Sequence, residues 1–277
     1  MTRILVTNDD GIGAPGLAAL VEALTRVGRV AVVAPDRQQS AVGHALTVSE
    51  PLRAFAMPWE GTELCYAVNG TPADCVKLAV SVLLPWRPDV VLSGINHGRN
   101  TAVNILYSGT VSAATEAALL GIPAIAISLD TYAMEADFRA AAAIAVRLVE
   151  LLPQLQLPER TLLNVNVPAI PAEHIRGVRV THQGRSLWRD WYERRQDPWG
   201  REYFWLAGEY ELCDSDPDAD DVALVQGYIS ITPIRFELTD TATAQRLKGI
   251  LEPMQRDVPA TSVEGDGAAP EHQSARL

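Results

Sequence analysis

The sequence predicts an α/β fold in which a mostly parallel sheet is covered by helices on both faces. Short apolar, β-prone runs alternate with segments of helical periodicity from residue 1 to about residue 129, and this alternation is typical of parallel sheets. The first run, Ile4–Val6, is continuously apolar, as expected of a strand buried on both faces. A chain of 277 residues, 48% of them hydrophobic, is long enough to bury a large core.

The first half of the chain supplies most of the expected sheet. The predicted strands are 4–7, 30–34, 89–93 and 122–129, and the predicted helices are 16–27, 75–84 and 111–120. Between residues 45 and 75 the alternation breaks down, and three short runs (46–48, 52–55 and 65–68) predict strands beside the main sheet.

The second half is less regular. We expect an Ala-rich helix over 138–152 closed by Pro153, strands over 162–167, 178–181 and 228–234, and helices over 220–226 and 241–251. Residues 252–277 contain few large apolar side chains and predict a disordered tail. The expected organisation is one domain over 1–251, with a core over about 1–180 and an extension over about 181–251.

Four of the six tryptophans fall between residues 188 and 205. Asp197–Gly200 has the composition of a turn between two strand-like arms, 191–195 and 202–206. A hairpin with this many aromatic side chains needs other protein surface to bury them. Packing on its own domain and burial in a subunit interface are both consistent with the sequence.

Composition excludes several classes of protein. The formal net charge of −11 argues against sequence-independent binding to a nucleic-acid polymer, which needs basic surface. No apolar run is long enough to span a membrane, and the chain starts without a signal-peptide pattern. Three cysteines without metal-site spacing fit a reducing compartment, so we expect a cytoplasmic protein.

Two adjacent carboxylates end the first expected strand. Asp9 and Asp10 follow Ile4–Val6 closely, and neighbouring carboxylates repel each other unless a positive charge lies between them. A hard divalent cation, which prefers oxygen ligands, would supply that charge. The alternative is an ordinary polar turn over Asn8–Gly11, because these residue types also favour turns.

Further oxygen-bearing side chains follow other strands. Ser40 lies in the loop after the second strand, and Asn96 follows the strand over 89–93. Ligands bind beyond the carboxyl ends of strands in a parallel sheet, so we expect these side chains beside Asp9 and Asp10. The set predicts an octahedral Mg²⁺ or Mn²⁺ site completed by water. Alternatively, Ser40 and Asn96 bond only to their own loops.

A phosphate site is predicted next to the metal site. Asn100 and the run Ser108–Thr110 precede the small-residue helix 111–120. A helix N-terminus offers free N–H groups and a partial positive charge. Ser108 and Thr110 add hydroxyl donors, and Gly109 permits close backbone approach. An ordinary N-cap by Ser or Thr is the alternative.

Other polar residues are weaker candidates. His44 and His97 lie in candidate active loops, where either could donate to a phosphate or act as an acid. The run Thr181–Arg185 could bring a cationic side chain toward a substrate. Neither a glycine-rich dinucleotide fingerprint after the first strand nor a Walker sequence is present.

Six blocks follow one another along the chain: Arg3–Leu17, Ala34–Ser40, Val68–Val76, Ser93–Asn100, Tyr107–Ala114 and Gly227–Pro233. Each resembles, in the same order, a block of the survival protein E (SurE) family of stationary-phase survival acid phosphatases and nucleotidases. The resemblance spans about residues 1–251. The tryptophan-rich hairpin and the tail do not follow a family pattern that can be aligned.

The resemblance implies a three-layer α/β/α, Rossmann-like fold with a C-terminal β-hairpin and helix extension. It implies a phosphomonoesterase that hydrolyses nucleoside monophosphates as a 5'-nucleotidase, with 3'-nucleotides and polyphosphate as further candidate substrates. It also implies one divalent metal ion per subunit, and a homodimer or homotetramer built partly through an exchanged hairpin and helix. The implied metal ligands are Asp9, Asp10, Ser40 and Asn96, and the implied phosphate contacts are Asn100, Ser108, Gly109 and Thr110.

The expected chemistry is in-line attack of water on a phosphomonoester, with Asp9 or Asp10 positioning or deprotonating that water. A covalent aspartyl-phosphate is less favoured, because haloacid-dehalogenase-like enzymes that form one carry Asp-x-Asp rather than an adjacent pair. Two other classes stay open: a non-catalytic nucleotide-binding or sensing module on the same fold, and a metal-dependent glycosyltransferase that uses the acidic pair.

Overall fold

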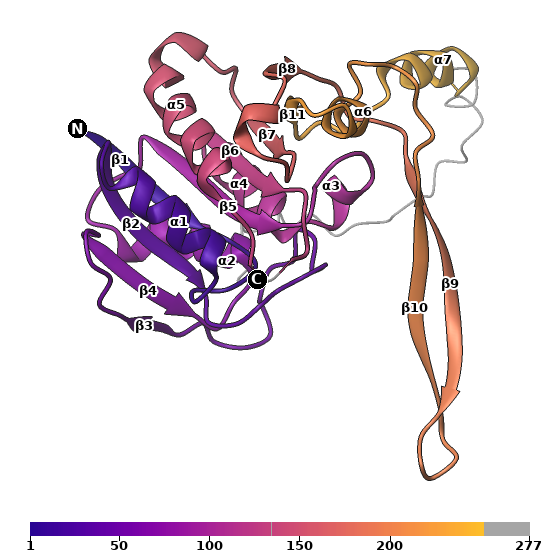
Figure 1. Cartoon of the computed structure of the whole chain (residues 1–277), viewed down its shortest axis with the longest axis horizontal. Helices are drawn as coiled ribbons and strands as arrows, with labels where there is room; N and C mark the ends of the chain where they lie inside the picture. The colour runs from indigo at the N-terminus through magenta and orange to yellow at the C-terminus, as the bar shows by residue number, and fades with distance from the viewer. Residues whose placement is uncertain (134, 252–277) are drawn as a thin grey trace, which may run out of the picture. The chain divides into compact units, whose positions relative to one another are not determined.

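A nine-stranded sheet forms the centre of the first of two compact units. The computed structural model describes residues 1–133 and 135–251, and the units are residues 1–235 and residues 236–277. Within the described ranges the strand order is β3–β4–β2–β1–β5–β6–β7–β11–β8 (Figure 1). The strands are β1 (Thr2–Thr7), β2 (Gly28–Pro35), β3 (Ala54–Ala56), β4 (Leu64–Val68), β5 (Val90–His97), β6 (Ala124–Leu129), β7 (Thr161–Val167), β8 (Val178–Val180) and β11 (Ile229–Arg235).

Most of the sheet is parallel, as predicted. β1 pairs in parallel with β2 on one side and with β5 on the other, and the parallel pairing continues through β6 and β7. Two antiparallel pairs complete the sheet, β3 with β4 and β11 with β7. The strand order reverses at β1, which makes the carboxyl ends of β1 and β5 the expected place for a ligand.

Helices cover both faces of the sheet and give the three layers that the resemblance implies. Ile4 and Val6 of β1 pack into one apolar cluster with α1 (Pro15–Leu24) and α5 (Arg139–Leu155), whereas Leu5 packs into a second cluster with α2 (Pro72–Leu78) and α4 (Gly109–Leu119). This alternation follows the period of two of a β-strand. The other elements are a π-helical turn (Ala79–Leu83), α3 (Asn104–Tyr107), a 3₁₀ turn (Ala172–His174), α6 (Asp220–Val225) and, in the second unit, α7 (Thr241–Leu251).

The local sequence explains how α2 and α4 begin. Thr71 caps α2 and accepts a hydrogen bond from the Asp74 N–H, while the Asp74 carboxylate accepts one from the Thr71 N–H. This reciprocal pair satisfies two of the free donors of the first turn. Ser108 caps α4 by accepting a hydrogen bond from the Val111 N–H, and the small residues of α4 let it pack closely on the sheet.

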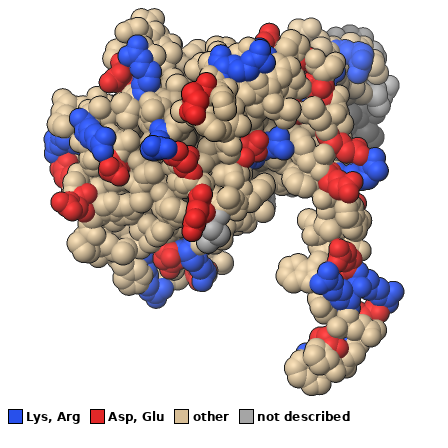
Figure 2. Space-filling model, viewed as in Figure 1, with Lys and Arg blue, Asp and Glu red and all other residues tan. Residues whose placement is uncertain are grey.

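The tryptophan-rich segment forms the predicted hairpin. β9 (Leu187–Gln196) and β10 (Glu202–Glu211) pair with each other in an antiparallel two-stranded sheet and extend away from the central sheet (Figure 1). Trp199 is 78% exposed and Trp205 is 59% exposed, so packing on the rest of the unit does not cover them. Acidic and basic side chains both lie along the hairpin (Figure 2).

Three predicted elements differ from the structure. Residues 46–48 form no strand, because the Thr47 N–H and hydroxyl group donate to the Asp74 carboxylate instead of to a neighbouring strand. The strand predicted over 89–93 continues to His97, because Asn96 and His97 still pair with β6 after a shift in register. Helix α5 includes Pro153, which is exposed in the last turn, where losing one backbone hydrogen bond is tolerated.

The other predicted helices and strands are present within a few residues of their predicted limits. The predicted tail, residues 252–277, lies outside the described residues. None of the helices in the described ranges combines the length and the hydropathy that crossing a bilayer requires.

Candidate metal and phosphate site

The turn after β1 presents the two adjacent carboxylates at the edge where the strand order reverses. The Asn8 side-chain amide donates to the Gly11 carbonyl at 2.9 Å, and Gly11 has a left-handed backbone with φ of 96°. The predicted polar turn therefore exists, and Asn8 and Gly11 form it. Asp9 and Asp10 lie between them with carboxylates that the turn does not use.

Asp9 is buried, with 6% of its surface exposed. Its carboxylate accepts a hydrogen bond from the Thr110 hydroxyl group in the first turn of α4. Burial raises the pKa of Asp9 to about 6, the Thr110 hydrogen bond opposes that rise, and the neighbouring Asp10 charge adds to it. A carboxylate in this environment gains strongly from a nearby positive charge.

Asp10 and Ser40 are joined through a residue that the sequence did not single out. The Gln38 side-chain amide lies 2.8 Å from the Ser40 hydroxyl oxygen and 3.5 Å from the Asp10 carboxylate. Asp10 also accepts the His97 backbone N–H at 3.1 Å. No sequence signal identifies Gln38, because it is an exposed glutamine in an irregular loop and only tertiary structure brings it to Asp10.

Asn96 projects from β5, which neighbours β1 in the sheet. Its side-chain nitrogen donates to the Gly98 carbonyl at 2.8 Å, so part of its side chain bonds to its own loop. Because the nitrogen is the donor, the amide oxygen is left as an acceptor. The amide of Asn96 can therefore support the loop and still offer an oxygen ligand.

The donor set suits a hard divalent ion. In the described part of the chain, no Lys or Arg side chain forms an ion pair with Asp9 or Asp10, and the His97 ring nitrogen lies 3.8 Å from the Asp10 carboxylate. The same residues contain no cluster of three or more His, Cys, Asp or Glu that could hold a metal. Two carboxylates with hydroxyl and amide oxygens are typical of Mg²⁺ or Mn²⁺ rather than zinc.

The N-terminus of α4 connects the carboxylate pair to the candidate phosphate site. Ser108 acts as an ordinary N-cap, and the Thr110 hydroxyl group donates a hydrogen bond to the Asp9 carboxylate. Gly109 lies against Asp9 so closely that a Cβ atom there would be 2.8 Å from the Asp9 Cβ. The backbone N–H groups of this turn therefore lie beside the carboxylates.

Asn100 is buried and held by the sheet. Its backbone N–H donates to the Asn166 side chain at 2.8 Å, and its side-chain amide donates to the Ser128 hydroxyl oxygen at 2.9 Å. An amide nitrogen carries two hydrogens, so one remains for an anion.

The weaker candidates have other partners. His44 lies 2.8 Å from Glu116 in α4, and the His97 ring packs edge-on against Phe138 at a centroid distance of 5.0 Å. In the run 181–185, Thr181 is buried and bonds to Ser230 and Thr232, and His182 pairs with Asp216.

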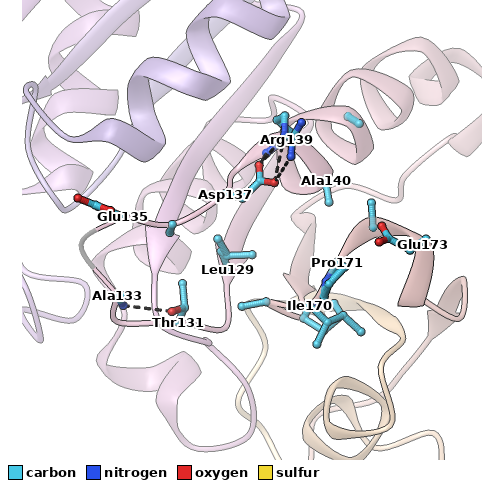
Figure 3. A pocket seen from close by; sticks show the side chains of 15 residues that line it. Leu129, Thr131, Ala133, Glu135, Asp137, Arg139, Ala140, Ile170, Pro171 and Glu173 are labelled. Carbon is cyan, nitrogen blue, oxygen red and sulfur yellow. Dashed lines mark hydrogen bonds and ion pairs between the residues drawn. The ribbon is translucent and has the colours of Figure 1, made fainter.

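A cavity of about 770 Å³ lies at the carboxyl ends of β6 and β7 (Figure 3). Its lining comes from residues within 129–133, 135–143 and 168–173, and it includes the ion pair between Asp137 and Arg139. None of the predicted site residues lines this cavity.

The raised pKa of Asp9 predicts a stability cost in the metal-free protein. In the folded chain the group titrates at about 6 rather than 3.8, so its stabilising protonated form is complete below about pH 4 and is lost as the pH rises through about 6. Asp9→Asn should therefore stabilise the chelated protein by up to about 3 kcal/mol near pH 8, and by about half as much near pH 5. Urea unfolding of both proteins in chelator measures this difference, and an equal difference at the two pH values would contradict the expectation.

The family model for "Survival protein SurE" matches residues 4–190. A 5'-nucleotidase SurE from Moorella thermoacetica is 51% identical over 249 residues, which cover 90% of this chain and 95% of that protein. A 5'-nucleotidase SurE from Flavobacterium psychrophilum is 42% identical and covers 88% of this chain and 95% of its own length.

The crystal structure of a SurE protein from Aquifex aeolicus superimposes with a TM-score of 0.77 and 41% sequence identity, covering 90% of this chain and 99% of that one. The sequence match and the structural match both extend over nearly the whole described fold. The chain therefore belongs to the survival protein SurE family.

Proposed function

We propose that the protein is a divalent-metal-dependent phosphomonoesterase that hydrolyses nucleoside 5'-monophosphates to nucleoside and phosphate. The observation that carries the proposal is the hydrogen bond between Thr110 and Asp9. This hydrogen bond joins Asp9 to the first turn of α4, and it supports a site in which the proposed oxygen ligands of a cation would lie beside the proposed N–H donors for a phosphate. The relatives named 5'-nucleotidase support the same activity.

The proposed ligands of one Mg²⁺ or Mn²⁺ ion per subunit are Asp9, Asp10, Ser40 and Asn96. Such an ion, when bound, supplies positive charge to phosphoryl oxygens and lowers the pKa of water. The donor chemistry fits it, and Gln38 would keep Ser40 beside Asp10.

The chain's own groups would bind the phosphate and accept a proton. Asn100 and the first turn of α4, with Ser108, Gly109 and Thr110, would hold the phosphoryl oxygens. Asp9 or Asp10 would take a proton from the attacking water as its oxygen bonds to phosphorus. The ester P–O bond then breaks, and the leaving oxygen of the nucleoside takes up a proton.

We also propose that the subunits associate into a homodimer or homotetramer through the hairpin, within the extension over residues 181–251. Exposed Trp191, Trp199 and Trp205 support this, because an aromatic surface of this kind is typical of interfaces. The three free cysteines support activity in a reducing compartment, the cytoplasm.

Phosphate release from a panel of nucleoside monophosphates tests the proposed activity. We expect release from 5'-monophosphates with Mg²⁺ or Mn²⁺ and none with a chelator. The panel should include 3'-monophosphates and polyphosphate, whose hydrolysis would widen the substrate class. If a folded, metal-loaded protein releases no phosphate but still binds nucleotides, the activity is wrong and the chain is a nucleotide-binding module.

A further inference from the structure

The loop between β5 and α4 carries Asn100 and is held on one side by the sheet. Asn166 accepts the Asn100 N–H at 2.8 Å, and the Asn164 side chain donates to the Asn100 carbonyl at 2.7 Å. Both asparagines belong to β7 and are fully buried. This side of the loop is therefore fixed by the core of the fold.

The other side of the loop is held at Ala102 by two side chains that are distant in sequence. The Ala102 N–H donates to both carboxylate oxygens of Asp220, at 3.1 and 3.2 Å. The Gln183 side-chain amide donates to the Ala102 carbonyl at 2.9 Å. Ala102 has a left-handed backbone with φ of 50°, which an alanine adopts only when its surroundings hold it there.

Asp220 is a fully buried carboxylate whose partners in the described structure are N–H groups rather than cations. Besides Ala102, its side chain accepts the Gly184 N–H at 2.9 Å and the Asp221 N–H at 2.8 Å. Burial raises its pKa to about 6, and the backbone hydrogen bonds oppose that rise. The carboxylate therefore depends on the backbone groups that it holds together.

Two of these backbone groups, those of Gly184 and Asp221, belong to the two roots of the hairpin, the segments just before β9 and after β10. Gly184 precedes β9, and Asp220 follows β10 at the start of α6. A Cβ atom at Gly184 would lie 2.5 Å from an Asp221 carboxylate oxygen and 2.9 Å from an Asp220 oxygen, so the packing leaves no room for a side chain.

Two further contacts link the same loop to the hairpin roots. The Trp188 ring nitrogen donates to the Asn104 side chain at 2.7 Å, and the Arg99 guanidinium group lies over the Tyr210 ring at 4.9 Å. Residues 99–104 are therefore in contact with the beginning of β9 and the end of β10. Asp220 is the buried carboxylate among the residues that make these contacts.

We propose that Asp220 is a positioning residue that connects the hairpin roots to the loop carrying Asn100 and thereby sets substrate affinity. Its effect on substrate rests on the proposed function, in which Asn100 contacts the phosphate. None of the hydrogen bonds of Asp220 in the described residues reaches the carboxylate pair or the other predicted metal ligands. Its loss should therefore weaken binding of the phosphoester and leave metal binding intact.

Asp220→Asn tests this in the full-length protein. The variant keeps the side-chain shape but places an N–H₂ group where one carboxylate oxygen accepts the Ala102 N–H. We expect KM for a 5'-monophosphate to rise about tenfold, with a smaller change in kcat. The affinity for Mn²⁺, measured by calorimetry, should be unchanged.

Asp221→Asn is the matched control. Asp221 is adjacent to Asp220 and equally buried. Its carboxylate accepts hydrogen bonds from the Val222 N–H and the Tyr210 hydroxyl group, and in the described residues it has no hydrogen bond to Ala102. This variant should keep the wild-type KM. If Asp220→Asn and Asp221→Asn change KM equally, the proposed positioning role is wrong.

Amide hydrogen exchange of the peptide covering 98–104 gives a readout that does not need activity. Exchange there should be about tenfold faster in Asp220→Asn than in wild type or Asp221→Asn. If wild type releases no phosphate, the proposed function fails, but this comparison still decides whether Asp220 holds the loop. Unchanged exchange in Asp220→Asn would overturn the inference.

Gln183→Ala provides a second, milder variant in case Asp220→Asn does not fold. Gln183 is an exposed residue, and it holds the Ala102 carbonyl. Its removal should raise both KM and loop exchange in the same direction, by less. Wild-type values for both quantities in a folded Gln183→Ala protein would contradict the proposal.

Discussion

Asp9→Asn is expected to lower kcat/KM for a nucleoside 5'-monophosphate on the order of 10³-fold. The variant keeps an oxygen for the Thr110 hydroxyl group, so the first turn of α4 stays in place. It removes the negative charge that we propose binds a cation, and with it one of the two proposed proton acceptors. Affinity for Mn²⁺ should fall together with activity, whereas the chelated protein should become more stable near neutral pH.

Glu22→Gln is a suitable control for this change. Glu22 is an exposed residue of α1 that pairs with Arg26, and its charge should have no effect on kcat/KM or on Mn²⁺ affinity. If Asp9→Asn retains wild-type kcat/KM and metal affinity, Asp9 neither binds the ion nor takes part in the reaction.

Gly109→Ala is expected to lower kcat/KM about 100-fold, because a displacement of about 1 Å at a reacting group can have this effect. The new Cβ atom would lie 2.8 Å from the Asp9 Cβ, 3.0 Å from an Asp9 carboxylate oxygen and 3.2 Å from the Pro72 ring. Either Asp9 or the first turn of α4 must move, and each movement would separate the carboxylate pair from the proposed phosphate donors. Steady-state kinetics with saturating Mn²⁺ measures the loss.

Gly13→Ala is the matched control for the Gly109 substitution. Gly13 is exposed in the loop that follows Asp9 and Asp10, and nothing lies within 4 Å of the Cβ atom that alanine would add there. This variant should keep wild-type kinetics. Equal losses in Gly109→Ala and Gly13→Ala would show that the contact between Gly109 and Asp9 is not what the activity depends on.

The strand ends of the core were predictable because their signals are local. The apolar run Ile4–Val6 predicts a strand, and parallel strands end at one edge of a sheet. Asp9 and Asp10 could therefore be expected near Asn96, and β1 does pair with β5. The capped start of α4 was predictable on the same basis, from Ser108 and the small residues after it.

Long-range polar contacts had no such signal. Residues 46–48 have the composition of a strand, but the side chain of Asp74 takes their donors. Gln38 reaches Asp10, and Glu116 holds His44. Each contact joins segments that are far apart in sequence, and the residue types of neither segment predict which partner it will have.

The sequence by itself determined the layered α/β fold, the hairpin and the family, because hydrophobic periodicity, turn residues and ordered motifs are local features of the sequence. Only the tertiary structure decided that Thr110 bonds to Asp9, that Gly109 must lack a side chain, and that Asp220 holds Ala102 beside the hairpin roots. The physical reason is that a buried polar group needs a partner in space, and which group it finds depends on how the folded chain brings distant segments together.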